Sequence, residues 1–436
     1  MKTIRYPEKA DWQTILARPA FETKSLDRHV QNILNFVEKD GDQAVRHFTK
    51  TLDKVEIENF LVSEGEFAEA EKNIADDLKT AINAARENIE KFHAAQTENV
   101  EIIETTPGVF CWRKSVPIER VGLYVPAGSA PLFSTVLMLG VPARIAGCRE
   151  IVLCSPPNEA GKIADVILYA AQTLGIRTVF KIGGAQAVGA MAFGTETVPK
   201  VYKIFGPGNQ FVTCAKQLVS QTGTAIDMPA GPSEVAILAD ETCVPAYVAA
   251  DLLAQAEHGV DSQVVLVTTR EKVIAETLSE LDQQLATLPR RAIAEKALEN
   301  SKAILARDET EAIEILNEYA AEHLIIATEN ADETAEKITN AGSVFIGNYS
   351  CESAGDYASG TNHTLPTGGY AKAFSGVSLD SFVKKITFQK LTEDGIRNLG
   401  ETVETLAAAE QLDAHKRAVS IRLESLKENL TVDAHG

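Results

Sequence analysis

The fold class follows from residues 150–205, which hold the apolar runs Glu150-Ile-Val-Leu-Cys154, Thr178-Val-Phe-Lys-Ile182 and Val201-Tyr-Lys-Ile-Phe205. Helix-like segments at about 132–146, 163–173 and 185–193 alternate with these runs. Alternation of this kind predicts parallel strands joined by crossover helices. The stretch is therefore expected to form an α/β domain.

A second series of strands and helices follows the turn Pro229-Ala-Gly-Pro232. Its expected strands are 234–238, 263–268, 303–306, 324–327 and 343–346. Two series predict an α/β protein with two Rossmann-like parallel-sheet domains, an N-terminal helical segment and a C-terminal helical tail. The expected division is a split domain of residues 1–122 plus 234–376 that includes the N-terminal helices, an inserted domain of residues 123–233, and a tail of residues 377–436. A tail beyond the last expected sheet element can be exchanged between the subunits of a dimer at low cost, and we expect such an exchange here.

Other segments differ in pattern from the two series. Residues 26–51 read as two helices broken at Asp40-Gly41, and residues 65–96 read as one long amphipathic helix. Alternation between about 100 and 123 predicts a hairpin. Residues 348–376 form a polar stretch without periodicity, which inside a compact domain is often functional.

Composition narrows the function classes. The 436 residues are 45% hydrophobic and 24% charged, as in ordinary globular proteins. The formal net charge of −19 argues against general binding of nucleic acids. No apolar run reaches the ~18 residues of a membrane helix, and the N-terminus lacks the hydrophobic core of a signal peptide. We therefore expect a cytoplasmic protein without a membrane partner.

The six cysteines form no CxxC pair, so a thiolate zinc cluster is not expected. Buried free thiols fit a reducing compartment. The alternative is a catalytic thiolate, but no cysteine lies beside a histidine or in an obviously basic turn.

The stretch Asp251-Leu-Leu-Ala-Gln-Ala-Glu-His-Gly-Val-Asp-Ser-Gln263 carries the first candidate site. Apolar positions at helical spacing and Gly259 predict a helix that ends near His258. Gln255 and His258 then share a face of the last turn. His258 could simply cap the helix, or the two side chains could form half of a metal site whose other half comes from elsewhere.

Three other stretches carry histidine together with a carboxylate: Glu322-His323, Glu410 with His415, and Glu352-Ser-Ala-Gly-Asp-Tyr-Ala-Ser-Gly-Thr-Asn-His363. Ligands of parallel sheets usually lie at the carboxyl ends of strands. Glu322-His323 precedes a strand, so it would have to face a cleft between domains to act on a ligand.

Two glycine turns follow strands and open helices: Gly183-Gly184-Ala-Gln186 and Phe205-Gly-Pro-Gly-Asn209. Their backbone N–H groups suit a pyrophosphate. The usual GxGxxG fingerprint is missing. Either turn, taken alone, is also explained by a tight connection between strand and helix.

Taken in order, these motifs resemble the histidinol dehydrogenase family. The resemblance rests on 251–259, Ala321-Glu-His-Leu324, 352–363 and Asp413-Ala-His415, together with the two glycine turns and Met228-Pro-Ala-Gly-Pro-Ser233. It extends from about residue 20 to about residue 425.

The resemblance implies a zinc- and NAD-dependent homodimer with intertwined subunits, which oxidises L-histidinol through L-histidinal to L-histidine with two NAD. It implies the following residues: Gln255, His258, Asp356 and His415 as zinc ligands that also contact substrate, Ser233, Glu410 and His323 as further substrate contacts, Glu322 and His323 for proton transfer, and Tyr124, Gln186 and Asn209 as NAD contacts. The physical chemistry of the set is consistent with this, because imidazole, carboxylate and amide ligands suit zinc. The alternatives are a zinc hydrolase, or a non-catalytic metal- or ligand-binding protein with the same fold.

Overall fold

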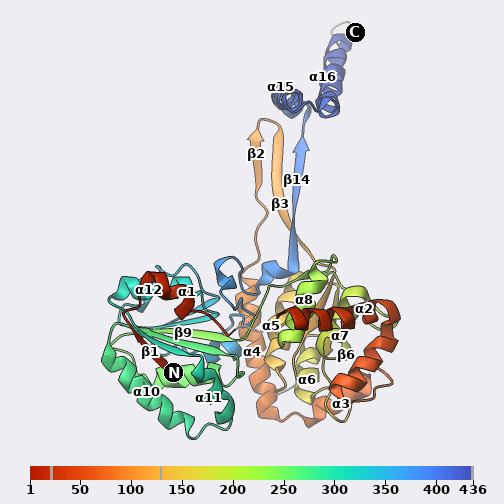
Figure 1. Ribbon diagram of the computed structural model, residues 1–436. Coiled ribbons are helices and arrows are strands. Elements are labelled where there is room, and N and C mark those ends of the chain that lie inside the picture. The colour runs from red at the N-terminus through yellow and green to blue at the C-terminus, as the bar shows by residue number, and fades with distance from the viewer. Residues whose placement is uncertain (20–22, 128–129, 434–436) are drawn as a thin grey trace. The chain divides into compact units, whose positions relative to one another are not determined.

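The computed structural model describes residues 1–19, 23–127 and 130–433 (Figure 1). The chain divides into two compact units, and each is described by itself. The first unit comprises Met1–Gln96 and Ile118–Phe382, and the second comprises Thr97–Pro117 and Val383–Gly436.

A six-stranded parallel sheet in the first unit carries the second predicted series of strands. Every residue of its two central strands β9 and β10 is buried, which explains their continuous apolar sequences. The edge strand β1 was not predicted, because only one of its four residues, Ile4, is clearly apolar. In spatial order the strands are β1 (Lys2–Arg5), β11 (Lys302–Leu305), β10 (Gln263–Thr268), β9 (Glu234–Ala239), β12 (His323–Ala327) and β13 (Ser343–Ile346).

The helices that accompany this sheet are mostly amphipathic. Trp12 and the apolar face of α12 form a core on one side of the strands, and α9, α10 and α11 contribute to a core on the other. These helices are α1 (Trp12–Ile15), α9 (Pro245–Ala256), α10 (Glu271–Leu285), α11 (Arg291–Glu299), α12 (Glu309–Tyr319), α13 (Ala331–Ala335) and α14 (Glu352–Tyr357).

A five-stranded parallel sheet, also in the first unit, carries the first predicted series. Its strands in spatial order are β6 (Thr178–Lys181), β5 (Glu150–Ser155), β4 (Arg120–Tyr124), β7 (Lys203–Phe205) and β8 (Ala225–Ile226). The crossover helices are α5 (Phe133–Ala146), α6 (Asp165–Thr173), α7 (Gly184–Phe193) and α8 (Gln210–Ser220). The α/β class with two parallel sheets is thus confirmed.

The N-terminal helices differ from expectation in two ways. The predicted break at Gly41 is present inside α2 (Thr23–Phe48), but the expected single helix of residues 65–96 is divided into α3 (Glu64–Asn73) and α4 (Asp76–Ala94). Helices α2, α3 and α4 pack on α7, α6 and α5, which belong to the five-stranded sheet. The division predicted from the sequence instead groups these helices with the six-stranded sheet.

The second unit combines an antiparallel sheet with a helical pair. The predicted hairpin is formed by β2 (Ile102–Thr106) and β3 (Val109–Pro117), with Gly108 at φ 82° in the turn. The predicted helical C-terminal segment is confirmed as α15 (Glu393–Ala409) and α16 (Asp413–Asp433), and it is preceded by an unpredicted strand, β14 (Val383–Leu391), which pairs with β3.

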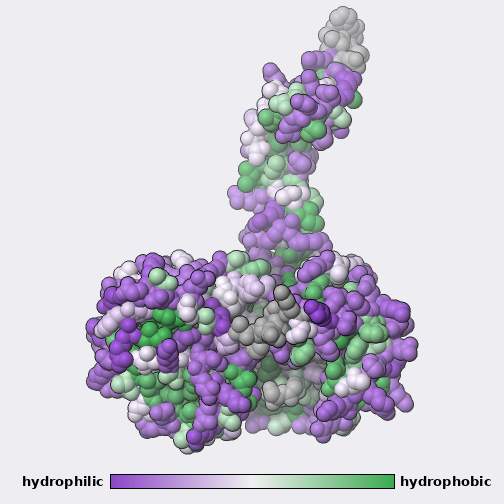
Figure 2. Space-filling model, viewed as in Figure 1, coloured by the Kyte–Doolittle hydropathy of each residue, from purple (hydrophilic) through white to green (hydrophobic). Residues whose placement is uncertain are grey.

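The surface of the second unit is partly apolar. On the face seen in Figure 2, hydrophobic residues interrupt its polar covering. Exposed apolar side chains of this unit include Ile102, Ile103, Ile386, Phe388 and Leu406. In the described part of the chain, no helix combines the length and apolarity needed to cross a bilayer.

Candidate functional site

Helix α9 and the turn after it present the first two candidate ligands. The helix starts with Pro245 in its first turn and ends at Ala256, two residues before the expected end. Gln255 is fully buried in the last turn, whereas His258 lies beyond the helix and is exposed. The backbone N–H of His258 donates to the Gln255 carbonyl at 3.3 Å, which keeps the two residues together.

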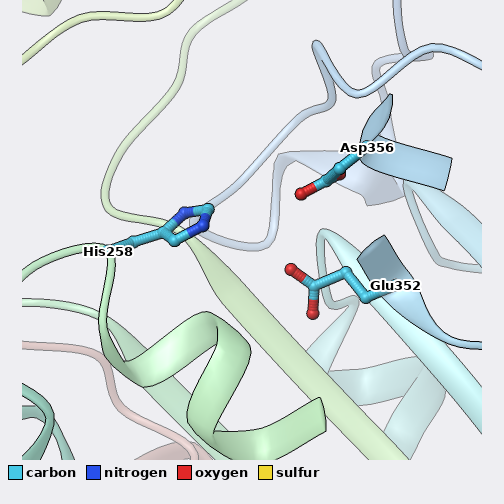
Figure 3. A group of neighbouring side chains, drawn as sticks. All are labelled: His258, Glu352 and Asp356. Carbon is cyan, nitrogen blue, oxygen red and sulfur yellow. The ribbon is translucent and has the colours of Figure 1, made fainter. Parts of the chain in front are cut away.

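Two carboxylates of α14 complete a group of three potential ligands. Glu352 and Asp356 are four residues apart, so they share one face of this short helix. The ligand atoms of His258, Glu352 and Asp356 all lie within 4.8 Å of one another, and Figure 3 shows the imidazole turned toward the carboxylates. One cation could contact all three. Glu352 was not among the predicted site residues, although its spacing from Asp356 is a signal that the sequence contains.

The amide of Gln255 belongs to the same group. Both of its polar atoms are satisfied when its nitrogen donates to Glu352 and its oxygen accepts from the Glu234 backbone N–H at 2.9 Å. A carbonyl oxygen has a second lone pair, so this oxygen remains able to coordinate a metal.

His323 stands at the start of β12 beside these ligands. Its Nδ1 lies 3.2 Å from the carbonyl oxygen of Glu234, so Nδ1 is the donor to that carbonyl, and in the neutral imidazole Nε2 is the acceptor. Nε2 lies 3.4 Å from Asp356 Oδ1, and both atoms are buried without a hydrogen-bond partner among the described residues. Unpaired buried polar atoms are costly, so this pair points to a bound group.

Glu322 precedes His323 and is held by the same residue of β9. Its Oε2 accepts from the Glu234 backbone N–H at 2.9 Å. Burial raises the pKa of Glu322 to about 8. Burial lowers the pKa of His323, but the carboxylates of Glu322 and Glu352 raise it more, to about 10. Although part of the His258 residue is open to solvent, desolvation of its ring by the surrounding residues lowers its pKa, which favours the neutral imidazole that a metal requires.

Glu234 is itself fixed by an ion pair. Arg18 donates to both carboxylate oxygens, at 2.5 and 2.9 Å, and Gly368 N–H donates to Oε1 at 2.8 Å. Arg18 also stacks over Tyr319 at 4.2 Å. The residue whose backbone orients Glu322 and His323 is therefore anchored by Arg18 and by the Gly368 N–H. Nothing in the local sequence indicated this role for Arg18 or Glu234.

As the sequence indicates, Glu322-His323 does not lie at the carboxyl ends of the strands, where ligands of parallel sheets usually bind. His323 pairs with Val235 and Ser343 at the amino-terminal ends of three parallel strands, and Ser233 lies just before β9. His363 links this region to the other sheet's helices, because its Nδ1 lies 2.9 Å from the Asp356 carbonyl and its Nε2 lies 3.2 Å from Thr135 Oγ1 on α5.

The predicted NAD contacts lie at the carboxyl ends of strands in the five-stranded sheet. The Tyr124 hydroxyl accepts from Gly184 N–H at 3.1 Å, and the buried Gln186 lies in the first turn of α7. Asn209 caps α8 by accepting from the backbone N–H groups of Phe211 and Val212, at 3.0 and 3.2 Å. This edge is the usual ligand-binding edge of parallel sheets.

Glu410 and His415 belong to the second unit. Glu410 follows α15 and His415 lies in the first turn of α16, and both side chains are exposed. The group around His258 thus contains three of the four predicted zinc ligands, and the fourth, His415, lies in the second unit.

The comparisons with known proteins agree with the motifs. The family model described as histidinol dehydrogenase matches residues 16–423. The histidinol dehydrogenase of Bacteroides thetaiotaomicron is 60% identical over 427 residues, covering 98% of this chain and all of that protein. The enzyme of the same name from Escherichia coli is 53% identical, with 95% of each chain covered.

A solved structure agrees as well. The crystal structure of histidinol dehydrogenase from Elizabethkingia anophelis superimposes with a TM-score of 0.96 at 55% identity, over 98% of this chain and 99% of that one. The matches in sequence and in fold both extend over nearly the whole chain. The chain therefore belongs to the histidinol dehydrogenase family.

Proposed function

We propose that the protein oxidises L-histidinol through L-histidinal to L-histidine with two NAD, using a zinc ion held by Gln255, His258, Asp356 and His415. The single observation that carries this proposal is the group of His258, Glu352 and Asp356 facing the unpaired Nε2 of His323. The donor set fits zinc, because imidazole nitrogens with carboxylate and amide oxygens suit that metal and leave positions for substrate.

Bound zinc would hold the substrate's nitrogen donors and polarise its oxygen, without redox chemistry of its own. The two hydrides need NAD as acceptor, because no side chain can take them. The neutral form of His323 removes the hydroxyl proton at Nε2, since its Nδ1–H is already donated to Glu234. Glu322 accepts a proton from the water that adds to the aldehyde in the second oxidation. Glu352 fixes the Gln255 amide so that its oxygen keeps one direction.

Further contacts follow from the same proposal. Ser233 and Glu410 would bind the substrate, and Tyr124, Gln186 and Asn209 would bind NAD. The protein would act as a homodimer in which α15 and α16 deliver Glu410 and His415 to the partner's site. The exposed apolar side chains of the second unit support a partner surface. The six free cysteines are consistent with the reducing cytoplasm.

The proposal is tested by removing and restoring the metal. Purified protein treated with a chelator should lose both its zinc, measured by elemental analysis, and its reduction of NAD with histidinol. Added zinc should restore both. Full activity in metal-free protein would refute the metal's role. A zinc hydrolase or a binding protein would produce no NADH in either state.

A further inference from the structure

Asp53 is a carboxylate beside the glycine turn of the five-stranded sheet, and no role has been assigned to it so far. It ends the short helical segment Thr49–Asp53, and Lys54 then turns the chain with a left-handed φ of 59°. A Cβ on Gly183 would meet Pro156 Cβ at 2.6 Å and Asp53 Oδ1 at 3.3 Å. Asp53 therefore lies against the connections that follow β5 and β6, at the carboxyl edge of the sheet.

The neighbouring Gln186 supplies a second, independent observation. Its Nε2 donates to Asp53 Oδ2 at 3.0 Å, which fixes the amide. Its Oε1 is buried and has no hydrogen-bond partner among the described residues, and Gln186 as a whole has no exposed surface. A buried acceptor without a donor indicates a missing ligand group. Tyr124 is occupied by Gly184 N–H on the other side of this turn.

The chemistry of this pair selects the ligand group. An ionised carboxylate and an amide oxygen are both acceptors, so they match hydroxyl donors and oppose a phosphate. Burial raises the pKa of Asp53 to about 6, so the carboxylate is still mainly charged at neutral pH. In Rossmann dinucleotide-binding folds a carboxylate about 20 residues after the glycine turn commonly binds the ribose 2′-hydroxyl. Here an N-terminal segment would supply that carboxylate.

We infer that Asp53 and Gln186 bind ribose hydroxyls of the dinucleotide and that Asp53 makes the site select NAD against its 2′-phosphorylated form, NADP. This inference rests on the proposed function only for the identity of the oxidant. A 2′-phosphate would face the Asp53 carboxylate, and the repulsion between like charges in contact would weaken the binding of NADP relative to NAD.

The matched test is Asp53→Asn. The asparagine oxygen can still accept from Gln186, so the local structure is kept while the charge is removed. We expect the ratio of kcat/KM for NAD to kcat/KM for NADP, measured with histidinol, to fall at least about tenfold. Glu38→Gln, an exposed change of equal charge on α2, should leave that ratio unchanged. Asp53→Ser provides a second neutral variant if the asparagine protein folds poorly.

A binding measurement separates this inference from the proposed reaction. Calorimetry with ADP-ribose and with its 2′-phosphate needs no turnover. The parent should bind ADP-ribose more tightly than its 2′-phosphate. Asp53→Asn should reduce the ratio of the two dissociation constants by a factor similar to that expected for the kinetic ratio. Equal losses for both ligands, an unchanged ratio, or no binding of ADP-ribose to the parent would each overturn the inference. Absence of NAD reduction together with the expected binding pattern would instead contradict the proposed function alone.

Discussion

At the scale of single residues, Glu234 explains why Glu322 and His323 can have different roles. Its backbone N–H holds the Glu322 carboxylate at 2.9 Å, and its carbonyl fixes His323 Nδ1 at 3.2 Å. The two backbone groups of Glu234 therefore orient a buried carboxylate and a buried imidazole.

His323→Asn removes the base but keeps a donor for the Glu234 carbonyl. We expect alcohol oxidation to slow by about 10²–10⁴-fold, the usual loss of a general base. Single-turnover NADH formation from histidinol measures this step, and the zinc content should stay near one per subunit. The exposed His47→Asn is the control. Normal alcohol oxidation in His323→Asn would show that another group takes the proton.

Glu322→Gln should affect the second oxidation more than the first, because only the aldehyde step consumes water. The half-reactions are measured separately with histidinol and histidinal. Equal damage to both would count against a water-activating role for Glu322.

Asp251 makes stability depend on pH. Burial raises its pKa to about 6 in the folded protein, against about 3.9 in an unfolded chain. The folded state then holds the proton more tightly, so stability is lost as the pH rises from about 4 to about 6 and is constant above. Asp251→Asn stays neutral, so its melting temperature should exceed the parent's by more at pH 7.5 than at pH 4.5.

One control variant and the partial exposure of Asp251 limit the interpretation of that comparison. The exposed Asp282→Asn on α10 should show no such widening. Partial exposure of Asp251 reduces the effect to about 1 kcal/mol, below the ~2.7 kcal/mol of a two-unit shift. A constant difference across the pH range would contradict the burial argument.

At the scale of elements, a buried ion pair holds the second glycine turn. Lys216 on α8 lies 2.5 Å from Asp227, and both side chains are almost fully buried. Lys216 donates to the Gly206 carbonyl and Asp227 accepts from Gly206 N–H, both at 2.8 Å. Gly206 has a φ of 124° and packs on the Tyr124 backbone, where a Cβ would clash.

Lys216→Met should therefore destabilise the protein by about 3–5 kcal/mol, because Asp227 would remain buried without its partner. Adding Asp227→Asn should recover part of the loss, and the KM for NAD should rise in the single variant as the turn loosens. Thermal unfolding and NAD titration measure both effects. A single variant as stable as the parent would show that the pair is not needed.

The elements also show how far the sequence predicts the fold. Buried strands such as β9 and β10 have long apolar runs, so the sequence located them. Strand β1 escaped prediction because it is short and lies at an edge. Strand β14 escaped because its residues are mostly exposed and its partner β3 is distant in sequence. The break between α3 and α4 interrupts a periodicity that otherwise continues.

The same limit applies to the site. Gln255, His258 and Asp356 were expected through family motifs, and the structure brings them together. Contacts between distant segments place Glu352, Glu234 and Arg18 at the site. An example is the Arg18–Glu234 pair, which no local sequence pattern predicts.

At the scale of the whole molecule, the proposed site needs His415 from the partner subunit. His258→Ala and His415→Ala should each be nearly inactive. If the tail acts in trans, each mixed dimer has one site with both lesions and one with neither. Random mixing makes about half of the dimers mixed, so roughly a quarter of wild-type sites should return.

Exchange of subunits must be shown in the same samples, for example with a tag on one variant. No recovery despite proven exchange would mean that His415 acts within its own chain.

The most direct measurement is the number of NADH molecules formed per L-histidinol consumed by the zinc-loaded protein. The proposed reaction predicts two NADH and one L-histidine for each L-histidinol, with no free aldehyde accumulating. One NADH with L-histidinal as the product, or consumption of substrate without NADH, would contradict it.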